Sequence, residues 1–199
     1  MTESEVITIE QITGPSGTPV YNEATAIRFC SDDIFAPALL KPCKVPPVGV
    51  SAYFSYPISI CLHYTGSFSL INNERFWGPG NISERWFSTD KGRMVAGRLD
   101  NASGGHGFLV GSYHQGTGTS GLTGYAIKDP DNGHPVYKGQ TISVVNVDTL
   151  DEDHPLVVDT RDITSAGRSK CLLLQTECYP GAGHDEMSPV ELIFAVDVV

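Results

Sequence analysis

The chain has 199 residues and a formal net charge of −10, with no run of Lys or Arg. This charge excludes a protein that gathers nucleic acid through a basic surface, and one that binds anionic membranes through a basic patch. A hydrophobic content of 40%, with 21 glycines and 13 prolines, predicts a turn-rich globular chain. We expect a single domain over residues 1–199, in which residues 1–50 hold an N-terminal arm and the first strand.

We expect neither a targeting segment nor a membrane span. The opening MTESEVITIE is polar and acidic, unlike a secretory signal, and no apolar run approaches the roughly 18 residues of a membrane span. The cysteines are odd in number, widely spaced and without a CxxC pair, which predicts reduced, mostly buried thiols in a cytosolic setting. They are Cys30, Cys43, Cys61, Cys171 and Cys178.

The first quarter of the chain predicts few regular elements. Alternating apolar residues indicate a strand at Glu5–Gln11, and Gly14–Gly17 indicates a turn. Ala24–Phe29 is a further candidate strand, followed by a loop or short helix at Asp32–Leu40. The three prolines of Lys41–Val50 predict an extended loop or a sheet edge.

The strongest pattern in the chain is the stretch Ile58–Leu70. Its apolar and polar residues alternate almost without a break, which predicts a long strand with one buried face and one face towards polar surroundings. His63 lies on the polar face, where we expect it to be solvated or at an interface. Gly66 interrupts the apolar face and is the candidate point for a bulge or bend that divides the stretch.

The stretch Asn72–Asn81 is rich in Asn, Gly and Pro, so we expect a loop that buries Phe76 or Trp77. The glycine-rich segment Gly104–Gly124 predicts one strand at Phe108–Val110 and a long loop. The remaining expected strands are short and separated by turns. They are Arg85–Phe87, Arg93–Leu99, Thr141–Asp148, Leu156–Asp159, Cys171–Tyr179 and Val190–Val198.

No segment shows helical spacing of apolar residues over three turns. Roughly eight to ten strands with frequent turn signals predict an all-β fold, namely an antiparallel eight-stranded jelly-roll sandwich. One irregularity is the adjacent pair Val144 and Val145, which breaks the alternation of its strand.

Two acidic stretches are candidates for divalent-cation sites. Asp148–His154 offers four carboxylates and an imidazole, but it lacks the turn-forming glycine of a calcium loop, so a solvated turn is the alternative. Asp129–Gly133 resembles the start of a calcium loop without its third acidic position and distal Glu. No histidine pairs with another histidine, or with a cysteine, at a metal-finger spacing. We assign no metal ligands.

The chain carries no arrangement typical of an enzyme. Its glycine-rich segment lacks GK[ST] and a following helix, so phosphate binding is not indicated. No GxSxG elbow occurs. His184–Glu186 lies in a loop flanked by Gly and Pro, with nothing that marks it as catalytic. We predict no catalytic residue and no cofactor.

Three further pieces lie in order along the chain. They are Tyr64–Ser67 (YTGS) with apolar alternation on either side, the strand end and polar loop His154–Gly167, and the closing strands Cys171–Tyr179 and Val190–Val199 with Asp197 near the end. Together they resemble the aromatic-x-Gly-Ser motif, the segment before the last two strands and the final hairpin of picorna-like positive-strand RNA virus capsid proteins. The Pro-aromatic pair of that family is missing from His154–Gly167.

This resemblance covers roughly Tyr53 to Val199, and it implies a structural function. The chain would be a coat protein that assembles, alone or with sister capsid proteins, into a closed non-enveloped shell around viral RNA. Its loops would line the outer surface, and its contacts with RNA would not run through a basic tail. It would reside in the virion, and in the host cytoplasm during assembly.

Two other readings belong to different classes. Trp77 and Trp86 lie near predicted loops, where aromatic side chains stack on sugars, so a carbohydrate-binding jelly roll is the main alternative. Alternatively, the same two tryptophans have a purely structural role and anchor the core or a loop. A cupin-like metal enzyme is the third reading, and it would need histidines that converge from neighbouring strands.

Overall fold

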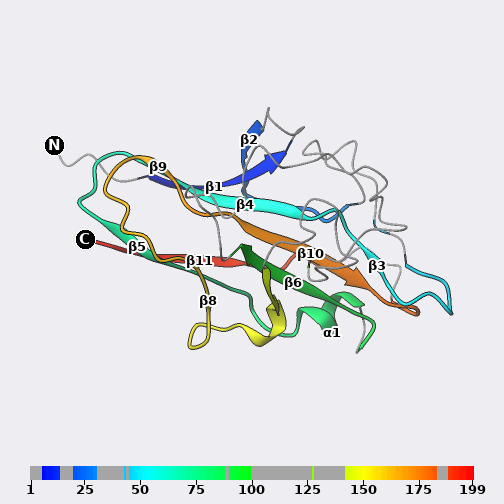
Figure 1. The fold of residues 1–199 in the computed structure, drawn as a ribbon. Coiled ribbons are helices and arrows are strands. Elements are labelled where there is room, and N and C mark those ends of the chain that lie inside the picture. The colour runs from blue at the N-terminus through cyan, green and yellow to red at the C-terminus, as the bar shows by residue number, and fades with distance from the viewer. Residues whose placement is uncertain are drawn as a thin grey trace.

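The computed structural model describes residues 6–13, 20–30, 43, 45–87, 90–99, 127, 142–182 and 188–199. Within these residues it contains eleven β-strands, one short α-helix and one turn of 3-10 helix (Figure 1). The predicted all-β class is therefore confirmed.

The strands form two antiparallel sheets, which we call the main sheet and the small sheet. The eight strands of the main sheet are β1 (Val6–Thr13), β2 (Val20–Glu23), β3 (Tyr53–Phe54), β4 (Ile58–Thr65), β6 (Gly92–Leu99), β7 (Ile142–Asn146), β9 (Gly167–Arg168) and β10 (Leu172–Cys178). The three strands of the small sheet are β5 (Ile71–Trp77), β8 (Leu156–Asp159) and β11 (Ile193–Val198).

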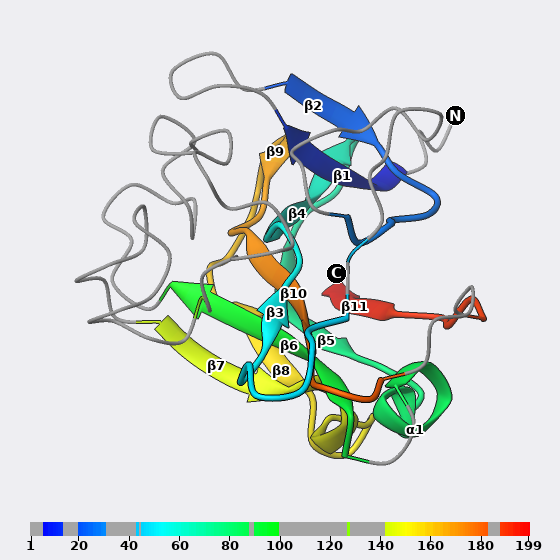
Figure 2. The same cartoon turned by 90° about the vertical axis from the view of Figure 1, so that its right-hand side faces the viewer.

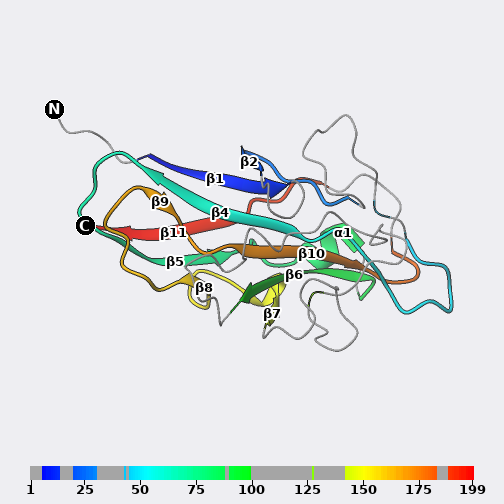
Figure 3. The ribbon, with the colours of Figure 1, turned by 45° about the horizontal axis from the view of Figure 1, so that its top comes forward.

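Strands that are distant in sequence lie side by side in both sheets. The main sheet has the order β2-β1-β4-β10-β6-β7, with β3 paired to β10 and β9 paired to β4 (Figures 1 and 3). The small sheet has the order β11-β5-β8. Figure 2 shows the main sheet extending from β2 to β7, with the small sheet to one side of it. The chain passes repeatedly from one sheet to the other, which places β4 and β10 together although more than a hundred residues separate them.

The two sheets pack against each other across a shared core. Alternate residues of the main sheet point into it, among them Ile60, Met94 and Leu172, and they meet Phe76 and Val158 of the small sheet. All five are at most 2% exposed. Burial of one face of every long strand is what the two-residue alternation in the sequence predicts.

The opposite face of the main sheet is also buried at its centre. Cys61, Val95 and Leu173 form a second apolar cluster there, and Tyr56 and Ile127 pack on it. The expectation that this face of the long stretch meets polar surroundings is therefore wrong at its first half, where Ser59 and Cys61 are fully buried. The broken alternation in β7 has the same cause, because Val144 packs on the outer cluster and Val145 on the inter-sheet core.

The long predicted strand divides where its glycine suggests. β4 ends at Thr65, and Gly66 has a φ of 86°, a conformation that costs glycine little. The chain then turns and enters the small sheet as β5.

β5 itself was expected to be a loop, and that expectation is wrong. A register shift between Glu74 and Arg75 interrupts its pairing with β8, so buried residues fall at Ile71, Glu74 and Phe76. This bulge breaks the two-residue period by which a strand is recognised. Asn73, with a φ of 55°, adds a left-handed residue within the strand.

Helix α1 (Ile82–Phe87) replaces the strand expected at Arg85–Phe87. Six residues are too few to show a helical period. The carboxylate of Asp148, distant in sequence, accepts hydrogen bonds from the N–H groups of Ile82 and Ser83 at 2.8 and 3.0 Å. The helix start is thus fixed by a tertiary contact and not by a local signal.

Other differences are smaller. Ala24–Phe29 belongs to no strand, although Ile27 and Phe29 pack against the inter-sheet core. The two closing strands do not pair as a hairpin, because β10 lies in the main sheet and β11 in the small sheet. The expectations for Gly14–Gly17, Asp32–Leu40 and Phe108–Val110 fall outside the described residues.

Gly92, the first residue of β6, tests the contact between α1 and the main sheet. A Cβ there would lie 2.4 Å from Cγ of Phe87 and 2.6 Å from the carbonyl oxygen of Glu177. We expect Gly92→Ala to lower the free energy of unfolding by about 1–3 kcal/mol, because the strand and the ring must move apart. Urea unfolding measures the change.

Gly167→Ala is the matched control, since the nearest atom to its added Cβ is 3.9 Å away. Its effect is expected to stay within about 0.5 kcal/mol. Equal unfolding midpoints for Gly92→Ala and the unchanged protein would contradict the tight packing at β6.

Candidate functional site

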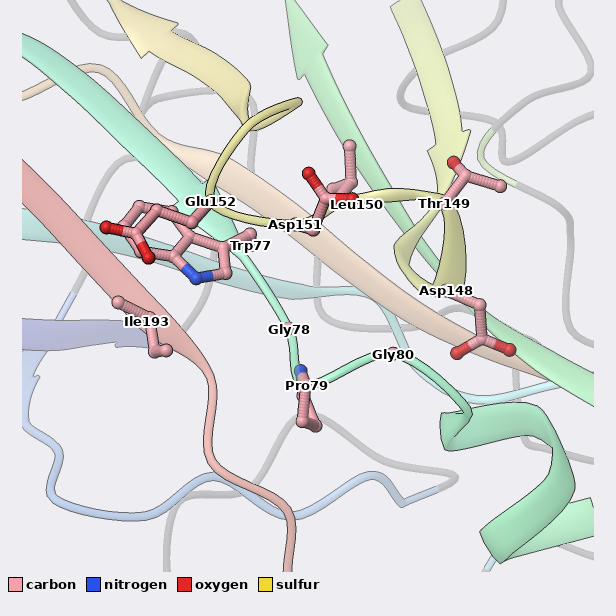
Figure 4. Close-up of a pocket in the computed structure, with 10 residues that line it drawn as sticks. All are labelled: Trp77, Gly78, Pro79, Gly80, Asp148, Thr149, Leu150, Asp151, Glu152 and Ile193. Atoms are coloured by element: carbon pink, nitrogen blue, oxygen red, sulfur yellow. The ribbon is translucent and has the colours of Figure 1, made fainter.

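A hollow of about 440 Å³ lies where the end of β5, the loop before α1, the 3-10 helix Val147–Thr149 with its following turn, and the start of β11 meet (Figure 4). We call it the Trp77 hollow. Its lining residues are Trp77, Gly78, Pro79, Gly80, Asp148, Thr149, Leu150, Asp151, Glu152 and Ile193.

The walls of the Trp77 hollow are held by contacts that do not involve a ligand. Asn146 caps the 3-10 helix through a side-chain oxygen that accepts from the N–H of Asp148 at 3.1 Å. The carboxylate of Asp148 in turn points towards the start of α1 and binds its N–H groups (Figure 4). Gly78 packs closely, because a Cβ there would lie 2.9 Å from Cγ1 of Val147. The hollow is thus preformed on two linked helical turns.

The lining of the Trp77 hollow has an apolar part and an acidic part. Trp77, Pro79, Leu150 and Ile193 provide the apolar surface. Asp148, Asp151 and Glu152 provide three carboxylates, and no Lys, Arg or His lines it among the described residues. The site therefore has a negative potential and an aromatic wall, and it offers nothing that would neutralise an anionic ligand.

Of the two tryptophans named as candidate sugar-stacking residues, only Trp77 lines the hollow. Trp86 lies on α1, where its Nε1–H donates to the carbonyl oxygen of Ser188 at 2.7 Å. Its ring makes edge contacts with Phe29 and Phe87 at centroid distances of 6.0 and 6.2 Å. Trp86 therefore anchors the helix to neighbouring segments, which is the structural role weighed above.

The acidic stretch Asp148–His154 divides into two local arrangements. Asp148 binds the start of α1, whereas Asp151 accepts from the backbone N–H of His154 at 2.7 Å and lies 3.0 Å from its Nδ1. These hydrogen bonds, those from the His154 backbone first, lower the pKa of Asp151. Within the described part of the chain, no group of three or more His, Cys, Asp or Glu side chains is placed to hold a metal ion. Asp129–Gly133, His184–Glu186 and Gly104–Gly124 lie outside the described residues.

His63 is half-buried and belongs to a polar cluster on the outer face of the main sheet. Its Nδ1 lies 3.1 Å from Oε1 of Glu10. The guanidinium of Arg168 donates to both oxygens of Glu10, and it lies 3.9 Å above the ring of Tyr21. The cluster joins β1, β2, β4 and β9, so His63 has a structural partner that its sequence position did not reveal.

A second polar cluster, inside the protein, was missed by the sequence analysis. Glu74 of β5 is 1% exposed and accepts hydrogen bonds from the hydroxyls of Tyr64 and Ser169 at 3.2 and 3.3 Å. Burial raises the pKa of Glu74 to about 8, opposed by these hydrogen bonds and reinforced by the charge of Asp159. Burial likewise raises the pKa of the Tyr64 hydroxyl.

Asp159 is the charged member of this interior cluster. It accepts from three N–H groups of Arg161 and from the backbone N–H of Lys170, at 2.6 to 3.0 Å. Burial opposes its charge, but these hydrogen bonds prevail and lower the pKa of Asp159. The cluster bridges the two sheets, because Tyr64 belongs to β4 of the main sheet and Glu74 and Asp159 to the small sheet. We call it the Glu74 cluster.

All five cysteines are free thiols, and four of them are buried. The prediction that most of the thiols are buried is therefore confirmed. Burial raises the pKa of Cys43 to about 12 and that of Cys178 to about 11. A hydrogen bond with Cys171, followed by burial, raises the pKa of Cys61. Thiols with raised pKa values are poor nucleophiles, so none of these three has the chemistry of a catalytic cysteine.

Among the described residues, no helix is long and apolar enough to span a lipid bilayer. Comparisons with protein-family models, curated proteins and solved structures return no significant match for this chain.

The Glu74 cluster predicts a specific pH dependence of stability. The raised pKa means that the folded protein holds a proton on Glu74 between pH 4.5 and about 8, whereas the unfolded chain does not. The free energy of unfolding should therefore fall as pH rises through this range, by at most about 5 kcal/mol in total. Glu74→Gln should flatten the curve and should be more stable than the unchanged protein at pH 9. Urea unfolding at several pH values measures both.

Glu84→Gln removes an exposed carboxylate on α1 and is the control for charge alone. It should leave the pH dependence of unfolding unchanged. If the curves of Glu74→Gln and the unchanged protein run parallel from pH 5 to pH 9, Glu74 does not hold a proton in the folded protein.

Proposed function

We propose that the chain is a structural subunit of a non-enveloped viral shell, built on a jelly roll. The order of the strands in the two sheets supports the jelly roll, and the resemblance of the motifs supports the step from that fold to a shell. A jelly roll has eight antiparallel strands in two sheets joined as Greek keys. In one sheet the second strand neighbours the seventh, the seventh the fourth, and the fourth the fifth. In the other, the first neighbours the eighth, the eighth the third, and the third the sixth.

Seven strands of this chain fit that order when β4 is taken as the second strand. β5, β6, β7 and β8 then follow as the third to the sixth, β10 as the seventh and β11 as the eighth. The main sheet contributes β4-β10-β6-β7 and the small sheet β11-β5-β8, both in agreement with the jelly-roll order. Every pairing involved is antiparallel.

Two features depart from a simple eight-stranded jelly roll. β1 and β2 extend the main sheet beyond β4, and the short strands β3 and β9 pair at its ends. Among the described residues, no strand takes the first position, beside β11. Many proteins with unrelated functions share this architecture, so the step from fold to shell rests on the resemblance of the motifs and not on topology alone.

Two of the three motifs occupy positions compatible with this step, whereas the two closing strands lie in different sheets and do not form the hairpin of that family. Tyr64–Ser67 spans the end of β4 and the bend at Gly66. His154–Gly167 contains β8 and leads to β9, before the two strands that close the chain. The partners of the subunit are copies of itself or sister capsid proteins. Since the net charge is −10, contacts with the enclosed RNA do not depend on a basic tail of this chain. The site of action is the virion, with the host cytoplasm as the place of assembly, and no reaction or cofactor is assigned.

Assembly is the property that tests the proposal. Purified native protein, screened over salt concentration and pH, should sediment as closed particles of uniform size that negative-stain electron microscopy resolves. The expectation follows from a subunit whose stable form is a symmetric oligomer. Dissociation back to the folded chain on changing the conditions distinguishes particles from aggregates. A monodisperse monomer under all conditions, alone and with co-expressed neighbouring gene products, would contradict the proposal.

A further inference from the structure

The Trp77 hollow is open to solvent and has the volume of a small-molecule site. Its volume of about 440 Å³ lies within the roughly 300–1,000 Å³ that is usual for such sites. Such sites combine apolar and aromatic walls with a few polar groups that orient the ligand. The hollow meets this description through Trp77 and Ile193 on the apolar side, and through Thr149, Asp151 and Glu152 on the polar side.

The polar groups of the hollow differ in how many of their hydrogen-bonding atoms are already used within the protein. Both oxygens of Asp148 already accept from the start of α1, and Oδ1 of Asp151 is engaged by His154. In the described structure, the exposed carboxylate of Glu152 and the indole N–H of Trp77 have no hydrogen-bond partner. The carboxylate of Glu152 and the indole N–H of Trp77 therefore leave acceptors and a donor beside an aromatic ring, which suits a ligand that carries hydroxyl groups around an apolar face.

The negative charge of the lining also restricts the charge of the ligand. Because no basic side chain lines the hollow among the described residues, a phosphate, sulfate or acidic sugar would bring its charge next to three carboxylates. A small cation would be attracted to the same carboxylates. However, Asp148 and Asp151 are already bound by N–H groups, and a small cation would leave the apolar wall unused.

We propose that the Trp77 hollow binds a neutral saccharide. The carbon-bound face of one sugar ring lies against the indole of Trp77, and its hydroxyls donate to the carboxylate of Glu152. The Trp77 N–H, which points along the plane of the indole, is left for a hydroxyl beyond the edge of the ring. Linked helical turns hold the walls in place before the ligand arrives, which lowers the ordering cost of binding. This inference concerns surface recognition, and it stands or falls independently of whether the chain assembles into a shell.

The experiment uses the full chain and begins with an array of immobilised neutral glycans that carry terminal glucose, galactose, mannose, fucose or N-acetylglucosamine. The best class is then titrated as its methyl glycoside into Trp86→Phe, whose one remaining tryptophan is Trp77. We expect retained binding and a saturable change of Trp77 emission. A blank array, or bound sugar that leaves this emission unchanged, would overturn the proposal.

Two variants locate the binding by calorimetry. Trp77→Ala should weaken it at least about tenfold through loss of the aromatic wall. Glu152→Gln alters an exposed side chain, should leave folding intact, and should weaken binding several-fold because a charged acceptor is replaced. Glu84→Gln, an exposed carboxylate outside the lining, should bind as the unchanged protein does. Full affinity in both Trp77→Ala and Glu152→Gln would place the sugar elsewhere and overturn the proposal.

A cationic ligand is the competing outcome. Spermidine and arginine methyl ester, titrated into Trp86→Phe, should give no saturable change in Trp77 emission. Sugar binding should also be nearly independent of salt, because the ligand carries no charge. Saturable binding of the amines without binding of any sugar, weakening as salt is added, would reassign the hollow to cations.

Discussion

Burial of both faces of the central main-sheet strands is the constraint on which the structure depends. β10 is buried at every position from Leu172 to Cys178 and lies between β4 and β6. A polar side chain in such a strand cannot reach solvent and needs an internal partner. Gln175 shows this, since its side chain donates to the carbonyl oxygen of Ser55 and accepts from the N–H of Ile127. One face of β10 then fixes where the small sheet packs, and the other fixes where Ile127 lies.

The same constraint explains which elements the sequence predicts. β4, β6, β8 and β10 lie within or close to the ranges expected from alternating or continuous apolar residues, and β4 ends next to Gly66, the expected point of division. For these strands, the burial of side chains decides where the strand lies in the sequence. The pattern of apolar residues shows that burial directly. The final strand follows the same rule at Phe194 and Val196, although β11 begins three residues later than expected.

The elements that were missed depend on contacts between distant residues. The two-residue alternation of β5 is interrupted at the bulge between Glu74 and Arg75. The strand also buries the carboxyl group of Glu74, whereas buried strand positions are normally recognised by apolar side chains. α1 depends on Asp148 for its first hydrogen bonds. The Trp77 hollow could not be predicted as a whole, because its walls come from separate segments. The sequence could single out Trp77 as a candidate, but not separate it from Trp86, whose anchoring role appears only with Ser188 in place.

β5 connects the polar cluster between the two sheets to the Trp77 hollow. Its bulge and its buried carboxyl group do not follow from its residue pattern, and local misfits of this kind concentrate where a protein keeps residues for reasons other than stability. Glu74, within the strand, ties the two sheets together through Tyr64 and Ser169. Trp77, at its end, forms one wall of the hollow. Because the other walls come from segments where the chain leaves β7 and enters β11, a ligand there would contact the connections between the sheets. Occupancy would then favour the folded arrangement by mass action, so that binding in the hollow would also stabilise the sandwich.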